Sequence, residues 1–369
     1  MPTREEYLRT IRRESDSSIP YFFCFCKTLV DKFEKKYGHM DYRKEYNIPL
    51  REVFLNPTRL NPKEVFHQYL TPEEKEGIVT EWGIILEPSD TAHFSHMVGP
   101  LRNATTVEEV EVLPFPDFLE DYRWVGVRER IAELKKEGKI IFPGIYGGLD
   151  IGTNKEETSA FMDIFESSWY LCGLDKFLMD MVVDEEYVEA LLDKMTELKC
   201  QLAKKWTEAG VDILITADDV GMQEGMMISV EMYQKWIKPR LKKVIDAAKS
   251  VNPEVLIFYH SDGDIWDIIP DLLEVGVEIL NPIQPECMNP IEVMEKYGDR
   301  CSFWGTIGTQ TTLPFGSVAD VESACRAVLD ARVGKGGLIL APTHLVEPEV
   351  PLENIEMLVE MAHEYSSRK

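Results

Sequence analysis

Basic residues are scarce in this sequence. The chain of 369 residues holds 40 Lys and Arg against 65 Asp and Glu, which gives a formal net charge of −25. Nucleic acids and anionic membrane surfaces are bound by clustered Lys and Arg, so this balance argues against both as partners. A solvated acidic surface that keeps the protein in solution is the plain interpretation of the charge.

Long apolar runs and regularly spaced cysteines are missing as well. No window of the sequence approaches the roughly 18 uncharged residues of a membrane-spanning helix, and Met1–Tyr7 has no apolar run typical of a signal peptide. The seven cysteines are odd in number and have no short, regular spacing, which excludes a disulfide framework. We therefore expect a protein of the reducing cytoplasm.

Several motifs that bind cofactors or mark hydrolases are also absent. The sequence contains no Walker loop, no Ser-His-Asp nucleophile elbow and no D-x-H-x-x-G cobalamin motif. The glycine-rich run Gly144–Gly148 lacks the G-x-G-x-x-G spacing of a dinucleotide-binding loop, which disfavours an open doubly wound sheet. A nucleotide or corrinoid carried on this chain is therefore not indicated.

What the sequence does contain is a regular alternation of apolar strands and helices. The expected strands are 19–26, 140–142, 211–216, 255–259, 277–280, 301–304 and 337–340. The expected helices are 3–13, 27–37, 125–137, 161–181, 185–209, 230–250, 290–297, 318–332 and 353–365. Such alternation is typical of a parallel sheet, and about seven visible strands suffice for a barrel of eight. We predict a single α/β domain over residues 1–369, a (β/α)₈ barrel of the TIM type.

Residues 38–121 interrupt this pattern. Prolines break the segment repeatedly, and a pair of strands is indicated only at 82–86 and near His93. We expect an irregular insertion or cap of short helices and loops, which is too polar and broken to form a barrel wall by itself.

Polar side chains follow the expected strands at the points where the strands end. The active site of a barrel is assembled from residues just after the carboxyl ends of its strands. These positions hold Tyr146, Asp218, Asp219, His260, Asp262, Gln284, Thr306 and His344. We expect their side chains to meet at the mouth of the barrel.

His260 and Asp262 form the sharpest pair among them. They lie two residues apart at a strand end, so both side chains can point the same way. With His344 they offer two imidazoles and a carboxylate, a three-ligand set that suits catalytic zinc and equally ferrous iron. Alternatively, His260 is only a hydrogen-bonded histidine at the mouth, and Asp262 caps the helix that begins near Ile265.

Asp218 and Asp219 are the second candidate pair. They can serve as a general base and a substrate anchor, or one of them can be another metal-binding carboxylate; buried together, each shifts the pKa of the other. In the alternative interpretation one faces solvent and the other caps the next helix. Met222 follows closely in the sequence and is expected to line a pocket.

Several stretches of the sequence resemble a known family. The runs Phe258–Asp264, Ile269–Pro282, Phe303–Gly308, Gly336–His344 and Val350–Asn354 look like the uroporphyrinogen decarboxylase family and its methyltransferase relatives. The resemblance covers most of the chain and is strongest toward its C-terminus. It implies a (β/α)₈ barrel, in agreement with the alternation of strands and helices.

The family contains two chemistries. Its decarboxylases bind an acidic tetrapyrrole through an arginine-rich R-Q-A-G-R-Y segment, for which this chain has Lys27–Tyr37 instead. The other branch transfers methyl groups to or from a corrinoid protein and binds zinc with H-x-C and a later Cys; the matching positions here are His260, Asp262 and His344. The resemblance therefore implies a zinc-dependent methyltransferase. The loss of both cysteines favours an oxygen-containing methyl donor, such as an aromatic ether, over the thiol coenzyme M.

On this interpretation the metal, zinc, is bound by His260, Asp262 and His344. Catalytic roles are expected for Asp218 and Asp219, and substrate contacts for Tyr146, Met222, Gln284 and Trp304. The substrate is a small methylated molecule, and the cobalamin belongs to a separate corrinoid protein that docks at the barrel mouth. Two alternatives remain open: a cofactor-free decarboxylase, and a non-catalytic barrel that binds a small ligand.

Overall fold

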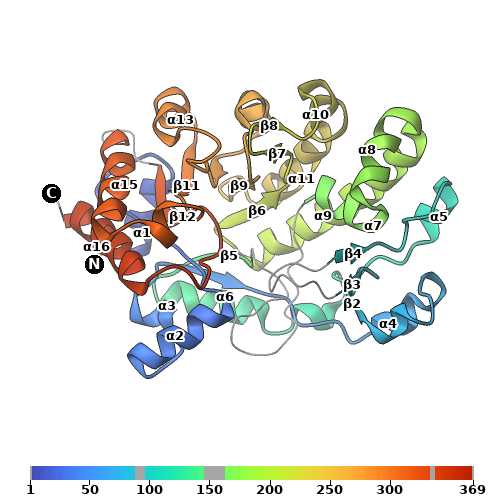
Figure 1. Ribbon diagram of the computed structural model, residues 1–369, viewed down its shortest axis with the longest axis horizontal. Coiled ribbons are helices and arrows are strands. Elements are labelled where there is room, and N and C mark those ends of the chain that lie inside the picture. Colours follow the sequence, from blue (N-terminus) through green and yellow to red (C-terminus); the bar gives the residue numbers. More distant parts are fainter. Residues whose placement is uncertain (1, 88–95, 145–162, 333–336, 368–369) are drawn as a thin grey trace.

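The computed structural model describes residues 2–87, 96–144, 163–332 and 337–367 and has a parallel barrel at its centre (Figure 1). The strands of its wall are β1 (Leu50–Val53), β5 (Ile140–Pro143), β6 (Ile213–Ala217), β9 (Leu256–His260), β10 (Ile279–Asn281), β11 (Ser302–Ile307) and β12 (Leu338–Pro342). They pair in the orders β1-β5 and β12-β11-β10-β9-β6. All of these pairs are parallel, as the alternating sequence predicts.

Two further contacts extend this wall around the barrel. The backbone N–H of Asp212 donates to the carbonyl oxygen of Ile141 at 2.7 Å and so joins β6 to β5. The early apolar segment runs beside β12, where Tyr21 and Phe25 form parallel bridges to Leu340 and Val346. With this segment counted, the wall has the positions of a (β/α)₈ barrel, and the predicted fold is confirmed.

Strand β1 corrects one expectation. It lies inside residues 38–121, which we expected to be an irregular insertion or cap, yet Leu50 to Val53 pair residue by residue with Ile140 to Pro143. Its sequence, Leu-Arg-Glu-Val, hides it because the two central residues are charged. Glu52 finds its counter-charge in Arg43, 3.0 Å away, which allows a carboxylate that is almost fully buried to sit in a strand.

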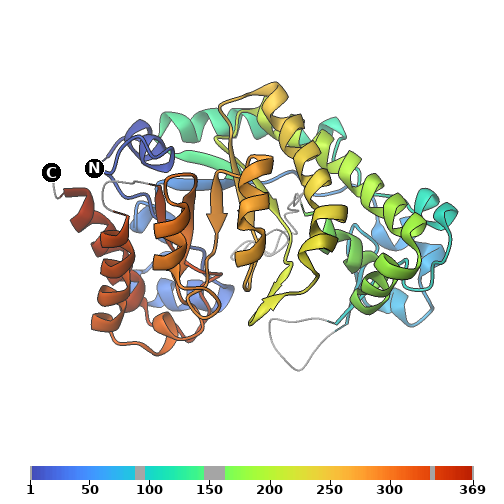
Figure 2. The same ribbon diagram turned by 90° about the horizontal axis from the view of Figure 1, so that it is seen from above.

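Helices form the outer layer, as Figures 1 and 2 show from two directions. They are α1 (Arg4–Ile11), α2 (Lys27–Tyr37), α3 (Tyr42–Glu45), α6 (Val127–Lys136), α7 (Phe165–Cys172), α8 (Leu174–Val183), α9 (Glu185–Ala209), α10 (Val230–Trp236), α11 (Lys238–Val251), α12 (Ile269–Val275), α13 (Pro290–Tyr297), α14 (Thr312–Phe315), α15 (Val318–Ala331) and α16 (Leu352–Ser367). The N- and C-terminal ends lie next to each other, because α1 and α16 both contact β12.

Two helices that the sequence predicts as continuous are each divided in the structure. Gly173, with a φ of 89°, separates α7 from α8, so two helices are present where the sequence predicts one helix over 161–181. Pro239 stands in the first turn of α11 and divides the helix expected over 230–250. Proline has no backbone N–H to donate into a preceding turn, so a new helix begins there.

Most of the described residues between β1 and residue 121 form an arm on the side of the barrel away from the chain ends (Figures 1 and 2). It holds α4 (Pro62–Val65), α5 (Val107–Val112) and a small antiparallel sheet of β2 (Ile78–Val79), β3 (Ile85–Glu87) and β4 (His96–Val98). The expected strand pair near 82–86 is thus present; His93 lies outside the described residues. Within the described ranges, no helix combines the length and apolar character needed to cross a membrane.

Candidate functional site

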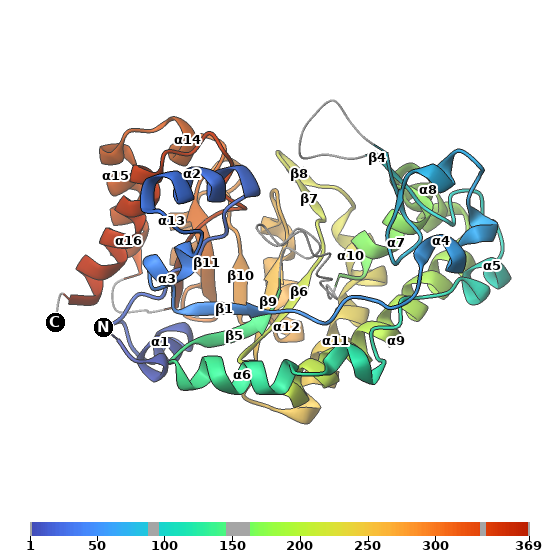
Figure 3. The same cartoon turned by 90° about the horizontal axis from the view of Figure 1, so that it is seen from below.

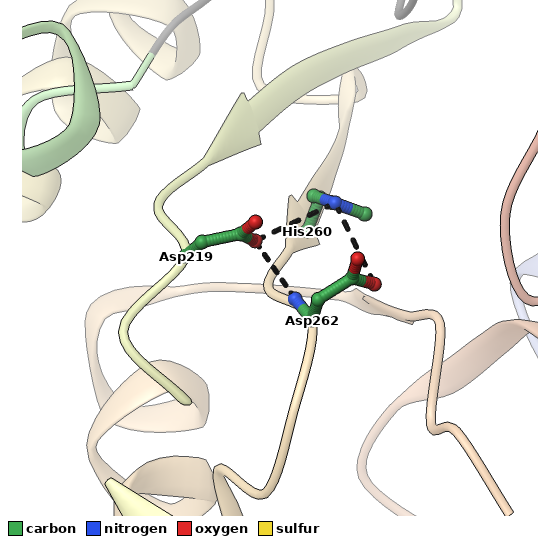
Figure 4. Close-up of side chains that lie close together, drawn as sticks. All are labelled: Asp219, His260 and Asp262. Atoms are coloured by element: carbon green, nitrogen blue, oxygen red, sulfur yellow. Dashed lines mark hydrogen bonds and ion pairs between the residues drawn. The ribbon is translucent and has the colours of Figure 1, made fainter. Parts of the chain in front are cut away.

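The mouth of the barrel is built where β6 and β9 end side by side. Ala217 and His260 are register partners, so the chain leaves both strands at the same level. The backbone N–H of Asp218 donates to the carbonyl oxygen of His260 at 2.9 Å. The backbone N–H of Asp262 donates to Asp219 Oδ1 at 2.8 Å. These bonds hold the two strand ends together and bring Asp219, His260 and Asp262 to one place (Figure 4).

Two glycines allow the loops after these strands to touch. A β-carbon on Gly221 would lie 2.6 Å from the carbonyl oxygen of Asp262, and one on Gly263 would lie 2.5 Å from the carbonyl carbon of Gly221. Gly263 also has a φ of 84°, which other residues rarely adopt. Residues with side chains at these positions would push the loops apart, and Asp219 would move away from Asp262.

Asp219, His260 and Asp262 each offer a ligand atom, and these atoms lie within 4.8 Å of one another. His260 Nε2 is 3.6 Å from Asp219 Oδ1 and 4.0 Å from Asp262 Oδ1, and the dashed lines in Figure 4 mark both contacts. Two ligands of a tetrahedral zinc ion stand roughly 3.3–3.5 Å apart. The group is therefore compatible with a metal ion after a small inward movement of the carboxylates.

Asn281 fixes which nitrogen of His260 faces the carboxylates. Its amide nitrogen donates to the carbonyl oxygen of Trp304 at 2.6 Å, so its amide oxygen is left to accept from His260 Nδ1 at 2.5 Å. Nδ1 must then carry the proton, and the lone pair of neutral His260 lies on Nε2, toward Asp219 and Asp262. A hydrogen bond of this kind commonly orients a metal-binding histidine. Asn281 ends β10 and is the register partner of His260, yet our sequence analysis did not single it out.

The charges of this group also bear on a metal. Burial raises the pKa of Asp262, and the nearby His260 opposes the rise. Burial lowers the pKa of His260, but the carboxylates of Asp219 and Asp262 outweigh it and leave the pKa raised. Asp262 Oδ1 is buried and has no hydrogen-bond partner within the described residues. Burying a carboxylate oxygen that accepts no hydrogen bond is costly, and a cation bound between this oxygen and the imidazole would offset the cost.

Asp218 has a different environment from its neighbour. It is fully buried, and its Oδ1 accepts three backbone N–H groups at the start of α7, from Ile164, Phe165 and Glu166 at 2.8, 2.6 and 3.1 Å. Burial raises its pKa well above the ordinary value. Asp218 thus caps a helix, but the helix is α7, which precedes it in the sequence, and not the next helix as the alternative interpretation expected. Asp219 instead joins His260 and Asp262.

Glu166 is a further acid at the mouth that sequence reasoning missed. It lies in the first turn of α7, and its Oε1 accepts from the hydroxyl of Tyr170 at 2.6 Å. Burial, followed by the negative charge of Asp219, raises the pKa of Glu166 to about 8, while the hydroxyl of Tyr170 and the charge of His260 act in the opposite direction. A carboxyl group that keeps its proton near neutral pH can act as an acid. No sequence motif marks it, because it begins a helix rather than ending a strand.

Behind Glu166 lies a buried ion pair. Lys199 Nζ is 3.5 Å from Asp163 Oδ1, and both side chains are at most 8% exposed. Ser167 donates to the same carboxylate and lies 3.3 Å from Lys199 Nζ. Burial raises the pKa of Asp163 and lowers that of Lys199. Lys199 thus provides the counter-charge of Asp163, whereas Asp219, Asp262 and Glu166 have His260 as their shared ionisable neighbour.

Comparison with known proteins agrees with this architecture. The family model described as uroporphyrinogen decarboxylase (URO-D) matches residues 164–365. The chain belongs to this family. The matched region runs from the start of α7 to α16 and so includes every residue of the Asp219–His260–Asp262 group.

Individual relatives within the family carry two kinds of name. A methylcobamide:CoM methyltransferase (MtaA) of Methanosarcina barkeri is 28% identical over 196 residues, which cover 53% of this chain and 54% of that one. The chain thus spans about half the length of the methyltransferases it matches. A uroporphyrinogen decarboxylase of Citrifermentans bemidjiense is 23% identical over 274 residues, or 73% of this chain and 72% of the relative. Among solved structures, a methyltransferase from Methanosarcina mazei superimposes with a TM-score of 0.68 at 18% identity and covers 99% of both chains, which shows the fold.

His344 occupies the mouth of this URO-D family member but stands apart from the three-residue group. It follows β12 and is half-buried, and its charge is close enough to lower the pKa of Asp262. The compact ligand group contains Asp219 where the sequence led us to expect His344. His344 as a metal ligand stays a prediction.

The residues expected to contact substrate have varied surroundings. Gln284 is buried, and its Oε1 accepts from the N–H of Gly263 at 2.7 Å, so it supports the loop that carries Asp262. Trp304 is 2% exposed and packs edge-on against Phe22, Phe142 and Phe258, with ring centroids 5.0–5.2 Å apart. These contacts make it a core residue of the barrel interior.

Of the other two predicted substrate contacts, Met222 is exposed and Tyr146 lies outside the described residues. Met222 is 53% exposed, in the short hairpin of β7 (Gly221–Met222) and β8 (Gly225–Met226). The role of both as substrate contacts remains a prediction.

Proposed function

We propose that this chain is a metal-dependent methyltransferase, which moves a methyl group from a small methylated donor to a separate corrinoid protein. The observation that carries the proposal is the Asp219–His260–Asp262 group, in which Asn281 directs the lone pair of His260 toward two carboxylates. The group lies at the end of the barrel where enzymes of this fold have their active sites. The relatives named methylcobamide:CoM methyltransferase support a methyl transfer that involves a corrinoid.

The metal is proposed to be zinc, held by His260, Asp219 and Asp262, and His344, whose charge acts on Asp262, stays a further candidate ligand. Three protein ligands with one open position are the usual set of a catalytic zinc site. Oxygen ligands replace the thiolates that the family resemblance would lead one to expect, and a harder ligand set suits an oxygen-containing donor such as an aromatic ether.

The remaining parts of the reaction fall to the chain's own residues. Methyl transfer breaks the bond between the methyl carbon and the heteroatom of the donor, and the electron pair stays on the heteroatom. A bound zinc ion would supply Lewis-acid chemistry that stabilises this developing charge. Glu166, whose pKa burial and then the charge of Asp219 raise in the metal-free site, is the proposed donor of a proton to the departing heteroatom. The methyl carbon is accepted by the corrinoid of a partner protein that docks at the barrel mouth.

The first experiment measures metal content. Wild-type protein purified without added metal is expected to contain roughly one zinc per chain. His260→Ala should lose it, whereas His67→Ala, which removes an exposed histidine of the arm, should retain it. A wild-type protein that stays metal-free after zinc is supplied would contradict the metal site.

The second experiment measures transfer. Zinc-loaded protein is mixed with 1,2-dimethoxybenzene and free cob(I)alamin, and formation of methylcobalamin is followed by absorbance. Asp262→Asn should abolish the reaction, and Asp267→Asn, an exposed carboxylate nearby, should not. If zinc-loaded protein transfers methyl from no methyl ether or methylamine, the proposed activity is wrong. Consumption of uroporphyrinogen by metal-free protein would instead establish the decarboxylase.

A further inference from the structure

A pocket of about 650 Å³ lies at the opposite end of the barrel from the metal-binding group. Asn47 and Lys139 line it and precede β1 and β5, whereas Asp219 and Asp262 follow β6 and β9. Figure 3 shows β1 and β5 running side by side between α3 and α6. The residues that line the pocket come from these elements and the residues next to them. The volume falls within the range of small-molecule sites, which is roughly 300–1,000 Å³.

The lining of this pocket is basic in a strongly acidic protein. It contains five cationic side chains and three carboxylates, while the whole chain carries a net charge of −25. The cationic residues are Arg43, Lys44, Arg51, Arg130 and Lys139. Of the carboxylates, Glu52 is paired with Arg43 at 3.0 Å, and the other two, Asp41 and Glu137, are exposed. The lining of this pocket therefore has more cationic than anionic side chains, although the chain as a whole has a large negative charge.

Two cations at the floor of the pocket have only neutral partners. Arg51 donates to the carbonyl oxygens of Ile48 and Arg43. Lys139 Nζ donates to Asn47 Oδ1 at 3.0 Å and to the carbonyl oxygen of Ile48 at 3.1 Å. Within the described residues, no carboxylate lies within ion-pair distance of either. Carbonyl oxygens satisfy the hydrogen bonds but carry no charge. Asp41 and Glu137 offset part of the positive charge from a distance, yet burial and the neighbouring cations outweigh them.

The floor cations also repel one another. Burial, and then the charge of Arg43, lowers the pKa of Arg51 to about 10. Burial, and then the charge of Arg51, lowers the pKa of Lys139 to about 8. Partly buried like charges destabilise the fold unless an anion joins them. The pocket thus has the size, charge and missing counter-charge of an anion-binding site.

We propose that this pocket binds a small molecule that carries a phosphate or diphosphate group, at a site separate from the metal-binding group. Arg51 and Lys139 at the floor contact the phosphate, because guanidinium and ammonium groups are the common phosphate-binding side chains of proteins. Lys44 and Arg130 at the exposed rim attract the anion. Phe54 and Leu134 supply an apolar wall for the rest of the molecule.

The test is calorimetric titration of pyrophosphate, without divalent metal, into the full-length protein and four variants. Lys139→Gln keeps an N–H donor at the floor but removes the charge, and it should weaken binding by about tenfold or more. Arg130→Glu should weaken it several-fold. Arg128→Glu is the matched control, since Arg128 is equally exposed on α6 but does not line the pocket. His260→Ala should bind as the wild type does, which separates this site from the metal-binding group.

Clear outcomes would overturn the proposal. One is the absence of any heat of binding at low millimolar pyrophosphate in the wild type. Another is equal weakening by Arg128→Glu and Arg130→Glu, which would indicate non-specific attraction. Loss of binding in His260→Ala would move the anion to the barrel mouth, and tighter binding of citrate than of pyrophosphate would contradict the phosphate assignment. Circular dichroism of Lys139→Gln ensures that weaker binding does not reflect unfolding.

Discussion

Carboxylates crowd around one histidine at the mouth of the barrel, whereas cations line a pocket at its other end. At the mouth, Asp219, Asp262 and Glu166 surround His260. At the opposite end, Arg51 and Lys139 share neutral oxygen partners. Each end carries an excess of charge of one sign in partly buried positions, where charge is costly unless it is paired.

The difference predicts a different kind of ligand for each end. On the two proposals, the carboxylates with their oriented imidazole receive a cation, and the basic floor receives an anion. A buried charged side chain that serves only to stabilise the fold is expected to have an oppositely charged partner in the protein. Glu52 is an example, because it forms an ion pair with Arg43. Variants that change the charge at one end can therefore test whether the two ends differ in the expected direction.

The largest expected effect concerns the buried ion pair next to the mouth. Lys199→Met leaves Asp163 buried without its counter-charge. Removing one partner of a buried pair typically costs about 3–5 kcal/mol, so we expect a loss of that order in the free energy of unfolding. Urea denaturation of metal-free protein at pH 7 measures it.

Lys204→Met is the matched control for this prediction. Lys204 is exposed on the same helix, α9, so its loss should change stability by about 0.5 kcal/mol or less. Similar stabilities of the two variants would mean that Asp163 is held as the neutral acid and needs no counter-charge.

The next effect concerns the orientation of His260. Asn281→Leu removes the acceptor for Nδ1 and the donor to Trp304. Loss of an outer partner of a metal-binding histidine commonly weakens metal affinity about 10–100-fold. Zinc competition with a chromogenic chelator measures the affinity. Asn289→Ala, which removes the N-cap of α13, should lower stability slightly and leave zinc affinity unchanged. Unchanged affinity in Asn281→Leu would argue against His260 as a ligand.

The barrel was predictable from the sequence because most of its strands are predominantly apolar. β6, β9 and β12 are buried along their whole length, so each appears as a short apolar run between helices. β1 escaped because Arg51 and Glu52 interrupt its pattern, and only the contact of Glu52 with Arg43 explains how a charged residue fits there. Pairing between distant segments decides such a strand, and local sequence does not reveal it.

The candidate site was predictable to the extent that it consists of residues at strand ends. This rule selected Asp219, His260 and Asp262, which the structure groups, and it also drew attention to Gln284. It could not select Glu166, which comes from the first turn of a helix. Nor could it separate Asp218 from Asp219, because only the three-dimensional position of α7 shows that Asp218 caps it.

A smaller effect is a pH dependence of stability at the mouth. The pKa of Glu166 rises in the folded protein to about 8 from an ordinary value of 4.5, because of burial and then the charges of Asp219 and Asp163. Between these pH values the folded state keeps a proton that the unfolded chain releases, so stability falls as the pH rises. Tyr170 and His260 reduce the effect. We expect wild-type metal-free protein to lose on the order of 2 kcal/mol more than Glu166→Gln between pH 5 and pH 9.

Denaturant unfolding at both pH values provides this measurement, with Glu189→Gln on α9 as the exposed control. Parallel pH profiles of the wild type and Glu166→Gln would show that Glu166 is ionised at neutral pH. Glu166 could then not be the proton donor of the proposed reaction.

The smallest effect has the opposite sign and belongs to the other end of the barrel. The folded protein lowers the pKa of Lys139 from 10.5 to about 8, chiefly through burial. Between these values the unfolded chain holds a proton that the folded state has released, so stability rises as the pH rises. Solvent screens this half-buried group, so the gain should be about 1 kcal/mol from pH 8 to pH 10.5, absent in Lys139→Gln and present in Lys136→Gln. Saturating pyrophosphate should remove the gain in the wild type, because a bound anion favours charged Lys139. If the gain persisted unchanged, the cations at this end would be structural, and the comparison between the two ends would reduce to one of charge alone.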